Sequence, residues 1–369
     1  MSALIVTLLS LSGITTLLAV LLVLADRIIN NYGEVEVNIN EGKKKLKVKG
    51  GSPLLFILAE NKIFVPSACG GRGSCGMCKV KVLSDVGPIL PTEEPYLSPD
   101  EKKEGVRLSC QVKVKKDISI ELPEWLFAVS KFKAVVERIT ELTYDIRELR
   151  LRLLDPLSIE FKAGQYVQLI IPPYDQVKES VMRAYSISSP PSQKDAIELI
   201  IRKVPGGIAT TYIFEHMKEG EEIEFVGPFG EFYLRPTSAR VIAIAGGSGM
   251  APIKSIIMDM YEKGIEREIY FFFGARSKAD LFYLDFYDEL QKKYPYLHFI
   301  PALSDPKPED EWEGEVGLVT DVAEKYLKSL PPSDQEGYLC GSPGMINACV
   351  KLLTRYGISE DRIYYDKFA

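Results

Sequence analysis

Three cysteines and four glycines lie close together in the segment CGGRGSCGMC, residues 69–78. Cys69, Cys75 and Cys78 have C-x5-C-x2-C spacing, and Cys110 follows later in the chain. A zinc site favours two closely spaced pairs of ligands, and Cys110 has no nearby partner. A [2Fe–2S] cluster takes three thiolates from a wrapped loop and a fourth from a separate element. The spacing therefore favours a [2Fe–2S] cluster over zinc or disulfides.

The glycines between these cysteines favour the same interpretation. Glycine adopts the unusual φ angles of a tight loop, and its exposed N–H groups stabilise the negative charge of sulfur. The four glycines concerned are Gly70, Gly71, Gly73 and Gly76.

A second group of candidate residues lies in RAYSISS, residues 183–189, on a predicted strand. Strand alternation places Arg183 and Tyr185 on one face and Ser186 on the other. A guanidinium suits a phosphate, a phenol ring can lie against an isoalloxazine, and a hydroxyl can hydrogen-bond to its N5 edge. Taken alone, these residues also fit an ordinary edge strand.

The segment PGGIATT, residues 205–211, follows a predicted strand and opens a predicted helix. Backbone N–H groups near Gly206 and Gly207, together with Thr210 and Thr211, are suited to binding a pyrophosphate at such a position. The segment RAYSISS resembles the flavin motif of ferredoxin reductases, and with it this segment implies a flavin site.

The segment GGSGMAP, residues 246–252, separates the apolar strand VIAIA from a predicted helix. Gly246, Gly247 and Gly249, followed by Met250, let the backbone approach a dinucleotide at the helix N-terminus. A purely structural turn is the alternative.

Arg276 ends the next predicted strand, where the adenosine end of a dinucleotide would lie. Its guanidinium suits a 2′-phosphate, which would favour NADPH. It can equally pair with Asp280 on its own helix turn, and we expect that pairing.

Four regions are predicted to position these residues. They are a transmembrane helix at 1–30, an α+β domain at 33–126, an antiparallel β-barrel at 130–236 and an α/β domain with a parallel sheet at 237–369. The α+β domain combines a hairpin over 35–49, a helix over 53–61 capped by Ser52, a strand over 79–83, a helix starting near Ser98 and a strand over 117–122.

The two later domains differ in their pattern of elements. Short strands separated by glycine and proline predict the barrel. They span residues 135–138, 146–153, 166–171, 184–188, 197–203 and 222–226. After residue 239, strands alternate with helices over 252–263 and 282–294, which predicts a crevice at the strand ends of a parallel sheet. Cys349 lies in a later predicted helix and is expected to be a core residue.

Charge excludes broad nucleic-acid binding. The 369 residues carry a net charge of −6, and no dense Lys/Arg tract is available to release phosphate counterions. The one basic run fits a solvated hairpin, with proximity to anionic lipid as the alternative. It comprises Lys43, Lys44, Lys45, Lys47 and Lys49.

Residues Ala3 to Ala25 contain no charge and no proline. At 1.5 Å per residue they make about 34 Å of helix, enough to cross a hydrocarbon core of about 30 Å. A signal peptide usually has a basic start and a shorter apolar region, so an uncleaved membrane helix is favoured. Lys and Arg follow Asp26 and are absent before Ala3, which places the remaining chain in the reducing cytoplasm at the inner (plasma) membrane.

Beyond these patterns, the chain resembles known families. The cysteine loop resembles that of [2Fe–2S] ferredoxins, and RAYSIS and GPFGEF resemble the flavin domain of ferredoxin reductases. Over nearly its whole length the chain looks like the F subunits of sodium-translocating NADH:quinone oxidoreductases. Further matching stretches are ILPTE, RLSCQV, ELPEW, GGSGMAPIKS, GARSKADLFY, ALSDPKPEDEW and CGSPGMINA.

The resemblance implies a function and further site residues. It implies a β-grasp ferredoxin domain with Cys69, Cys75, Cys78 and Cys110 as ligands. It also places Cys340 beside the nicotinamide C4 and implies that Phe368 covers the flavin. NADH would give a hydride to FAD, and single electrons would pass to the cluster and then to a membrane acceptor such as ubiquinone. Other membrane subunits, membrane lipid and sodium transport are implied as well.

The sequence departs from this family at two places. Only about a dozen residues join Ile171 to Arg183, where the family usually has an insertion, which puts docking to the usual membrane partners in doubt. The C-terminus reads YYDKFA, without the family's final glycines. A stand-alone or oxygenase-type NAD(P)H:acceptor reductase is therefore the alternative function. A non-catalytic redox sensor is a third, against which the intact flavin and nicotinamide motifs argue.

Overall fold

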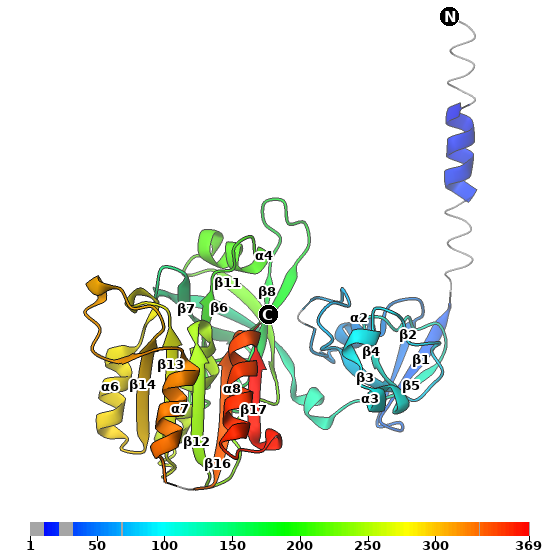
Figure 1. Cartoon of the computed structure of the whole chain (residues 1–369). Helices are drawn as coiled ribbons and strands as arrows, with labels where there is room; N and C mark the ends of the chain where they lie inside the picture. The colour runs from blue at the N-terminus through cyan, green and yellow to red at the C-terminus, as the bar shows by residue number, and fades with distance from the viewer. Residues whose placement is uncertain (1–10, 22–31, 68, 332, 369) are drawn as a thin grey trace, which may run out of the picture. The chain divides into compact units, whose positions relative to one another are not determined.

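A computed structural model describes residues 11–21, 32–67, 69–331 and 333–368 (Figure 1). Contacts between Cα atoms divide the chain into two compact units, Met1–Ser130 and Lys131–Ala369. Residues 11–21 are helical. The predicted membrane helix over Ala3 to Ala25 extends at both ends into residues outside the described ranges. Within the described ranges, no helix is both long and apolar enough to cross a membrane.

The first unit contains a mixed five-stranded sheet with the order β2-β1-β5-β3-β4. β1 pairs antiparallel with β2, as the predicted hairpin requires, and parallel with β5. Alternate residues of β1 are buried, which gives the sheet one apolar face. The strands are β1 (Glu34–Ile39), β2 (Lys44–Lys49), β3 (Lys79–Val82), β4 (Val106–Leu108) and β5 (Ile118–Glu121).

The helices of this unit begin in different ways. α3 (Pro99–Lys103) has the capping box of Ser98 and Glu101, as its sequence predicts. The predicted Ser52 cap is wrong, because α2 (Leu54–Glu60) is preceded by Pro53 and has no side-chain cap. The N–H groups of Leu54 and Leu55 instead donate to carbonyls in the segment that carries Cys110. The short helices η1 (Glu94–Tyr96) and η2 (Glu124–Ala128) complete the unit.

The second unit begins with an antiparallel six-stranded sheet with the order β10-β7-β6-β11-β8-β9. It curls into a half-barrel around a hydrophobic core, and an isolated bridge joins Ile187, just after one edge strand, to Leu199 of the other. The antiparallel sheet predicted for this β-barrel domain is confirmed, in the form of a half-barrel. The strands are β6 (Ser130–Glu141), β7 (Ile146–Asp155), β8 (Tyr166–Ile171), β9 (Val181–Ser186), β10 (Ala196–Arg202) and β11 (Glu222–Phe229).

A six-stranded sheet with the order β15-β14-β13-β12-β16-β17 follows, and its neighbouring strands pair in parallel, as predicted. α5 and α6 pack on one face, and α7 and α8 cover the other (Figure 1). The strands are β12 (Arg240–Gly246), β13 (Ile269–Ala275), β14 (Leu297–Leu303), β15 (Glu315–Val316), β16 (Gln335–Gly341) and β17 (Ile363–Lys367). The helices are α4 (Ile208–Thr211) in the half-barrel, then α5 (Met250–Glu262), α6 (Leu284–Lys293), α7 (Val319–Ser329) and α8 (Pro343–Arg355).

Half-barrel and parallel sheet share one core. Ile146, Ile200 and Phe232 of the half-barrel belong to the same buried cluster as the apolar residues of α5. Burial of apolar area is the main favourable contribution to folding. The predicted flavin and nicotinamide motifs therefore lie on one compact unit with a shared core.

A buried ion pair lies at the amino end of the parallel sheet. The side chains of Arg267 and Glu336 are 3% and 1% exposed, and their Nη2 and Oε2 atoms are 2.6 Å apart. Thr237 and Tyr338 also donate hydroxyl hydrogen bonds to Glu336. Burial alone would raise the pKa of Glu336, but these donors hold that pKa below its ordinary value.

We expect this carboxylate to make stability depend on pH. A depressed native pKa contributes stability above the unfolded-state pKa of about 4.3, and that contribution is lost as the pH falls through the native pKa. Thermal unfolding of the full chain in detergent, from about pH 7 to about pH 3, measures the effect. Glu336→Gln should have a flatter pH dependence than the unsubstituted chain, and identical slopes would contradict this role.

Candidate functional site

The four predicted cluster cysteines meet as two pairs. Sγ of Cys75 lies 3.4 Å from Sγ of Cys69, and both residues are half-buried. Cys78 and Cys110 are buried with their thiols in contact. Their backbones are held together because the N–H of Ser109 donates to the carbonyl of Cys78. The loop before β3 and the segment after β4 therefore bring all four sulfurs to one site.

Each pair contains one thiol that ionises easily. Burial opposes ionisation of Cys69, but backbone N–H groups of Ser74 and Gly71 and the Cys75 thiol lower its pKa to about 6. The Cys78 thiol lowers the pKa of Cys110 to about 7, while the pKa values of Cys75 and Cys78 are raised. The loop amides thus favour thiolate sulfur, the form that binds iron.

Glycines keep this loop close to its surroundings. Gly73 and Gly76 have φ angles of +73° and +67°. A Cβ at Gly73 would lie 2.7 Å from the Gln111 side chain, and one at Gly76 would lie 2.5 Å from the Tyr96 ring. The glycine requirement predicted for the wrap is therefore steric as well as conformational.

A buried pair that sequence reasoning missed supports the fourth cysteine. Arg107 donates to both carboxylate oxygens of Glu93 and to the carbonyls of Gly87 and Pro88. Glu93 is 0% exposed and also accepts from the N–H of Leu108. The only signal for this pair in the sequence is a charged residue in each of the stretches ILPTE and RLSC. The pair fixes the strand that leads into Cys110.

The four sulfurs are arranged as two pairs, Cys69 with Cys75 and Cys78 with Cys110. Among the described residues, no group of three or more His, Cys, Asp or Glu is placed to hold one metal ion. A cluster with two irons needs only two thiolates at each iron. Two cysteine pairs therefore fit a binuclear cluster.

The predicted flavin residues lie on a regular edge strand. β8 and β9 pair antiparallel, with Leu169 opposite Arg183 and Val167 opposite Tyr185. Arg183 and Tyr185 are half-buried on one face, as predicted, and Ser186 is buried at the strand end. Burial raises the pKa of Tyr185, so its phenol stays neutral at ordinary pH.

The glycine loop before α4 has an internal support. Gly206 has a φ of +70°, and the hydroxyl of Thr210 bonds to the N–H and the carbonyl of Val204. Thr210 is buried, whereas Gly206 is exposed and Gly207 and Thr211 are half-buried. The Thr210 side chain thus shapes the loop, together with the N–H groups of Gly207 and Thr211, which donate to the carbonyls of Val204 and Gly207.

The dinucleotide motif borders a cavity of about 290 Å³ at the carboxyl end of the parallel sheet. Gly246 and Gly247 line it from the parallel sheet, and Asp145 and Arg202 line it from the half-barrel. Nη1 of Arg202 would lie 3.6 Å from a Cβ at Gly247. Sequence reasoning missed both half-barrel residues, because nothing local marks a residue that faces a later domain.

Arg276 also lines this cavity, but the predicted partner is wrong. Its guanidinium pairs with Asp305, at 3.1 Å between Nη2 and Oδ2. Asp280 instead accepts from Ser277 and from the hydroxyl of Tyr144. β13 and β14 are adjacent, so Asp305 approaches Arg276 from the neighbouring strand end.

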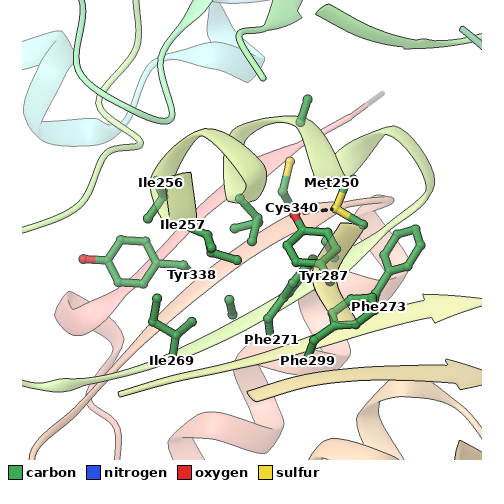
Figure 2. Packing of buried hydrophobic residues seen from close by; sticks show 14 of the residues in the cluster. Met250, Ile256, Ile257, Ile269, Phe271, Phe273, Tyr287, Phe299, Tyr338 and Cys340 are labelled. Carbon is green, nitrogen blue, oxygen red and sulfur yellow. Dashed lines mark hydrogen bonds between the residues drawn. The ribbon is translucent and has the colours of Figure 1, made fainter. Parts of the chain in front are cut away.

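Cys340 and Met250 belong to the hydrophobic core between α5 and the parallel sheet. Both are fully buried, and Figure 2 shows them among the apolar side chains between α5 and the sheet. Neither residue is part of the cavity lining. Cys340 approaches the dinucleotide motif through its backbone, because a Cβ added at Gly249 would lie 2.2 Å from the carbonyl oxygen of Cys340. Phe368 is half-buried, and its N–H donates to the carbonyl of Gly341.

Comparison with known proteins connects these sites. Residues 37–115 match the 2Fe-2S iron-sulfur cluster binding domain, residues 133–233 match the oxidoreductase FAD-binding domain, and residues 243–351 match the oxidoreductase NAD-binding domain. The F subunit of the Na(+)-translocating NADH-quinone reductase of Pseudomonas aeruginosa is 39% identical, with 95% of each chain covered. The chain belongs to the family of these F subunits. The F subunits of Neisseria meningitidis and Actinobacillus succinogenes are 37% and 38% identical, with 96% and 97% of each chain covered.

Solved structures of other reductases are also similar to this chain. The Amycolatopsis cytochrome P450 reductase GcoB is 29% identical with a TM-score of 0.71, covering 90% of this chain and 98% of that one. The ferredoxin reductase in carbazole 1,9a-dioxygenase is 26% identical with a TM-score of 0.67, covering 91% and 99%. The overall fold of this chain therefore also occurs in reductases of oxygenase systems.

Proposed function

We infer that this chain is the electron-input subunit of a sodium-translocating NADH:quinone oxidoreductase. The observation that carries this conclusion is its match to the F subunits of such enzymes over almost their entire length. When bound, FAD exchanges two electrons with NADH and a [2Fe–2S] cluster exchanges one at a time, so FAD must stand between them. The protein supplies binding, orientation and electrostatics for that relay.

Four cysteines hold the cluster in this proposal. Cys69 and Cys75 bind one iron, and Cys78 and Cys110 bind the other. The support is the pairing of the sulfurs and the lowered pKa of one thiol in each pair. Glycine N–H groups in the loop offset the negative charge that sulfur carries.

The edge strand of the half-barrel holds FAD. The Arg183 guanidinium binds phosphate, the Tyr185 ring lies against the isoalloxazine, and the Ser186 hydroxyl hydrogen-bonds to its N5 edge. The loop at Gly206 and Gly207 lies along the pyrophosphate. Thr210 and Thr211 hold that loop in shape, because the Thr210 hydroxyl bonds to Val204 and the N–H of Thr211 donates to the carbonyl of Gly207.

NADH lies in the cavity at the carboxyl end of the parallel sheet. Gly246, Gly247 and Gly249 let the pyrophosphate approach the backbone, and Met250 begins the helix behind them. Cys340, near the end of β16, lies on the side of the nicotinamide C4. Phe368 covers the flavin. Arg276 contacts the adenosine end.

Specificity for NADH follows from the Arg276–Asp305 pair. Asp305 already holds the guanidinium, and its charge repels a 2′-phosphate. Asp305→Ser should raise the ratio of kcat/KM for NADPH to that for NADH by about tenfold, or about 1.4 kcal/mol. Steady-state rates with ferricyanide measure the ratio. The double variant Arg276→Ala/Asp305→Ser should lose the gain, and an unchanged ratio in Asp305→Ser would contradict the assignment.

Membrane attachment is proposed from the sequence of Ala3 to Ala25, an uncharged apolar run long enough to span a bilayer. The distribution of Lys and Arg places the remaining domains on the cytoplasmic side of the plasma membrane. Other membrane subunits and lipid are then the physical partners, and a quinone is the final acceptor of the complex.

The test is an anaerobic titration of the full chain in detergent with NADH, followed by visible absorption and low-temperature EPR. Flavin bleaching followed by a one-electron cluster signal is expected. Bleaching without a cluster signal would contradict the cluster assignment, and no bleaching would contradict the function as a whole.

The second candidate is an NAD(P)H:acceptor reductase of the oxygenase type, favoured by the similarity to the Amycolatopsis reductase over 90% of the chain. Purification from native membranes separates the two functions. Copurifying membrane subunits would support the first function, because the similar F subunits belong to a quinone reductase complex. A soluble oxygenase partner would support the second.

A further inference from the structure

One ammonium group connects the two halves of the second unit. Lys254 lies on α5, one helical turn after the GGSG segment, and its side chain is only 9% exposed. Its Nζ atom is 2.9 Å from Glu198 on β10 and 3.4 Å from Glu148 on β7. The side chains of both glutamates are also largely buried, at 13% and 6% exposed.

Further charged and polar side chains contact the two carboxylates that pair with Lys254. Arg150 and Arg138 approach the same carboxylates from the half-barrel, at 3.3 Å or more. Tyr283, at the start of α6, donates its hydroxyl to Glu148, and its ring lies 5.2 Å from the Lys254 ammonium. Among the described residues, Lys254 is the one cation that the nucleotide domain contributes to these two carboxylates.

The same contact reaches the segment that follows the flavin strand. The hydroxyl of Ser255, next to Lys254, donates to the carbonyl of Ser189 at 2.7 Å. The backbone of Glu198 contacts the same segment. Its N–H donates to the Ser189 hydroxyl, and its carbonyl accepts from the N–H of Ser188. Residues 187–189 directly follow Ser186. A short chain of contacts therefore joins the second turn of α5 to the end of the flavin strand.

We propose that Lys254 is a positioning residue for hydride transfer. Its buried ammonium fixes the dinucleotide loop at the start of α5 against the end of the flavin strand, and so sets the distance between nicotinamide and isoalloxazine. Hydride transfer needs reacting atoms held about 3–3.5 Å apart, and a misplacement of about 1 Å costs about 100-fold in rate. An apolar contact alone is non-directional, whereas a buried ion pair with two carboxylates fixes both distance and register.

This inference rests on the proposed function, because it assumes FAD and NADH at the sites assigned above. Lys254→Met keeps the length of the side chain and removes the charge. Lys254→Arg keeps the charge. Lys263→Met is the matched control, because Lys263 directly follows α5, is 61% exposed and, within the described part of the chain, forms its ion pair with Asp259 of α5.

Stopped-flow reduction of the full chain by NADH gives a limiting rate and a dissociation constant separately. We expect Lys254→Met to lower the limiting rate by about 10- to 100-fold, with a much smaller change in the dissociation constant. The long-wavelength charge-transfer absorption between nicotinamide and flavin should weaken in parallel. Lys254→Arg should restore most of both, and Lys263→Met should match the unsubstituted chain.

A measurement without cofactors tests the same contact. Amide hydrogen exchange of the cofactor-free chain should be faster at residues 186–189 and 250–255 in Lys254→Met, and unchanged there in Lys263→Met. If Lys254→Met loses its flavin, Glu198→Gln takes its place, because it removes one of the two negative partners and keeps the shape.

The outcomes separate the two proposals. If the unsubstituted chain is not reduced by NADH, the proposed function fails. If it is reduced and the flavin-bound variant has the same limiting rate and charge-transfer band, the role of Lys254 is overturned. A rate loss that Lys254→Arg does not restore would also overturn it, because the loss would then come from packing alone.

Discussion

Replacing Cys110 by alanine is expected to abolish the visible absorption and the EPR signal of the iron–sulfur cluster. Cys110 is the only one of the four cysteines outside the loop, and its thiol completes the buried pair with Cys78. With three thiolates one iron would lack a ligand. Loss of a group that only supports a ligand costs about 10- to 100-fold, so loss of the ligand itself should lower electron delivery beyond the flavin by at least about 100-fold.

The same variant should keep its flavin chemistry. The predicted flavin and nicotinamide residues lie in Lys131–Ala369, and Cys110 lies in the other unit. Ferricyanide reduction by NADH, which takes electrons from the flavin, should therefore stay within about twofold of the unsubstituted chain. Cys349→Ala is the control, because Cys349 is also buried, at 0% exposed against 6% for Cys110, but lies in α8 among apolar side chains. A full cluster signal in Cys110→Ala would disprove the ligand assignment.

Features that depend on a few adjacent residues could be predicted from the sequence. The cysteine loop, the capping box at Ser98 and the antiparallel hairpin of β1 and β2 all follow from local spacing. Local chemistry decides these features, since a glycine φ angle or a capping hydroxyl acts within one turn. The parallel sheet was predictable for a similar reason, because strands alternating with helices permit few other arrangements.

Features that depend on distant partners were missed or wrong. Ser52 has a capping side chain, but the first N–H groups of α2 find carbonyls near Cys110 instead. Arg276 pairs with Asp305 on the next strand, because tertiary proximity replaces the local partner Asp280. Lys254 looks like an ordinary helix residue in the sequence. Its carboxylate partners lie in another domain, so nothing within its own helix marks its burial.

Replacing Gly249 by alanine is the second change for which we expect a large effect. Its φ of −60° is accessible to any residue, so the obstacle is space and not conformation. The new Cβ would lie 2.2 Å from the carbonyl oxygen of Cys340 and 2.7 Å from its carbonyl carbon. β16 cannot withdraw, because it is paired on one side with β12 and on the other with β17. The dinucleotide loop must therefore move away from the sheet.

A shift of about 1 Å in this loop should lower the limiting rate of flavin reduction by NADH by about 100-fold, because the nicotinamide moves with it. The flavin content should stay unchanged, since the half-barrel residues are not displaced. Gly344→Ala is the control: Gly344 lies in the exposed first turn of α8, and a Cβ there meets nothing within 4 Å. Stopped-flow reduction compares the two variants. Equal rates of flavin reduction in Gly249→Ala and Gly344→Ala would mean that the loop need not approach Cys340. The backbone contact between Gly249 and Cys340 would then have no part in hydride transfer.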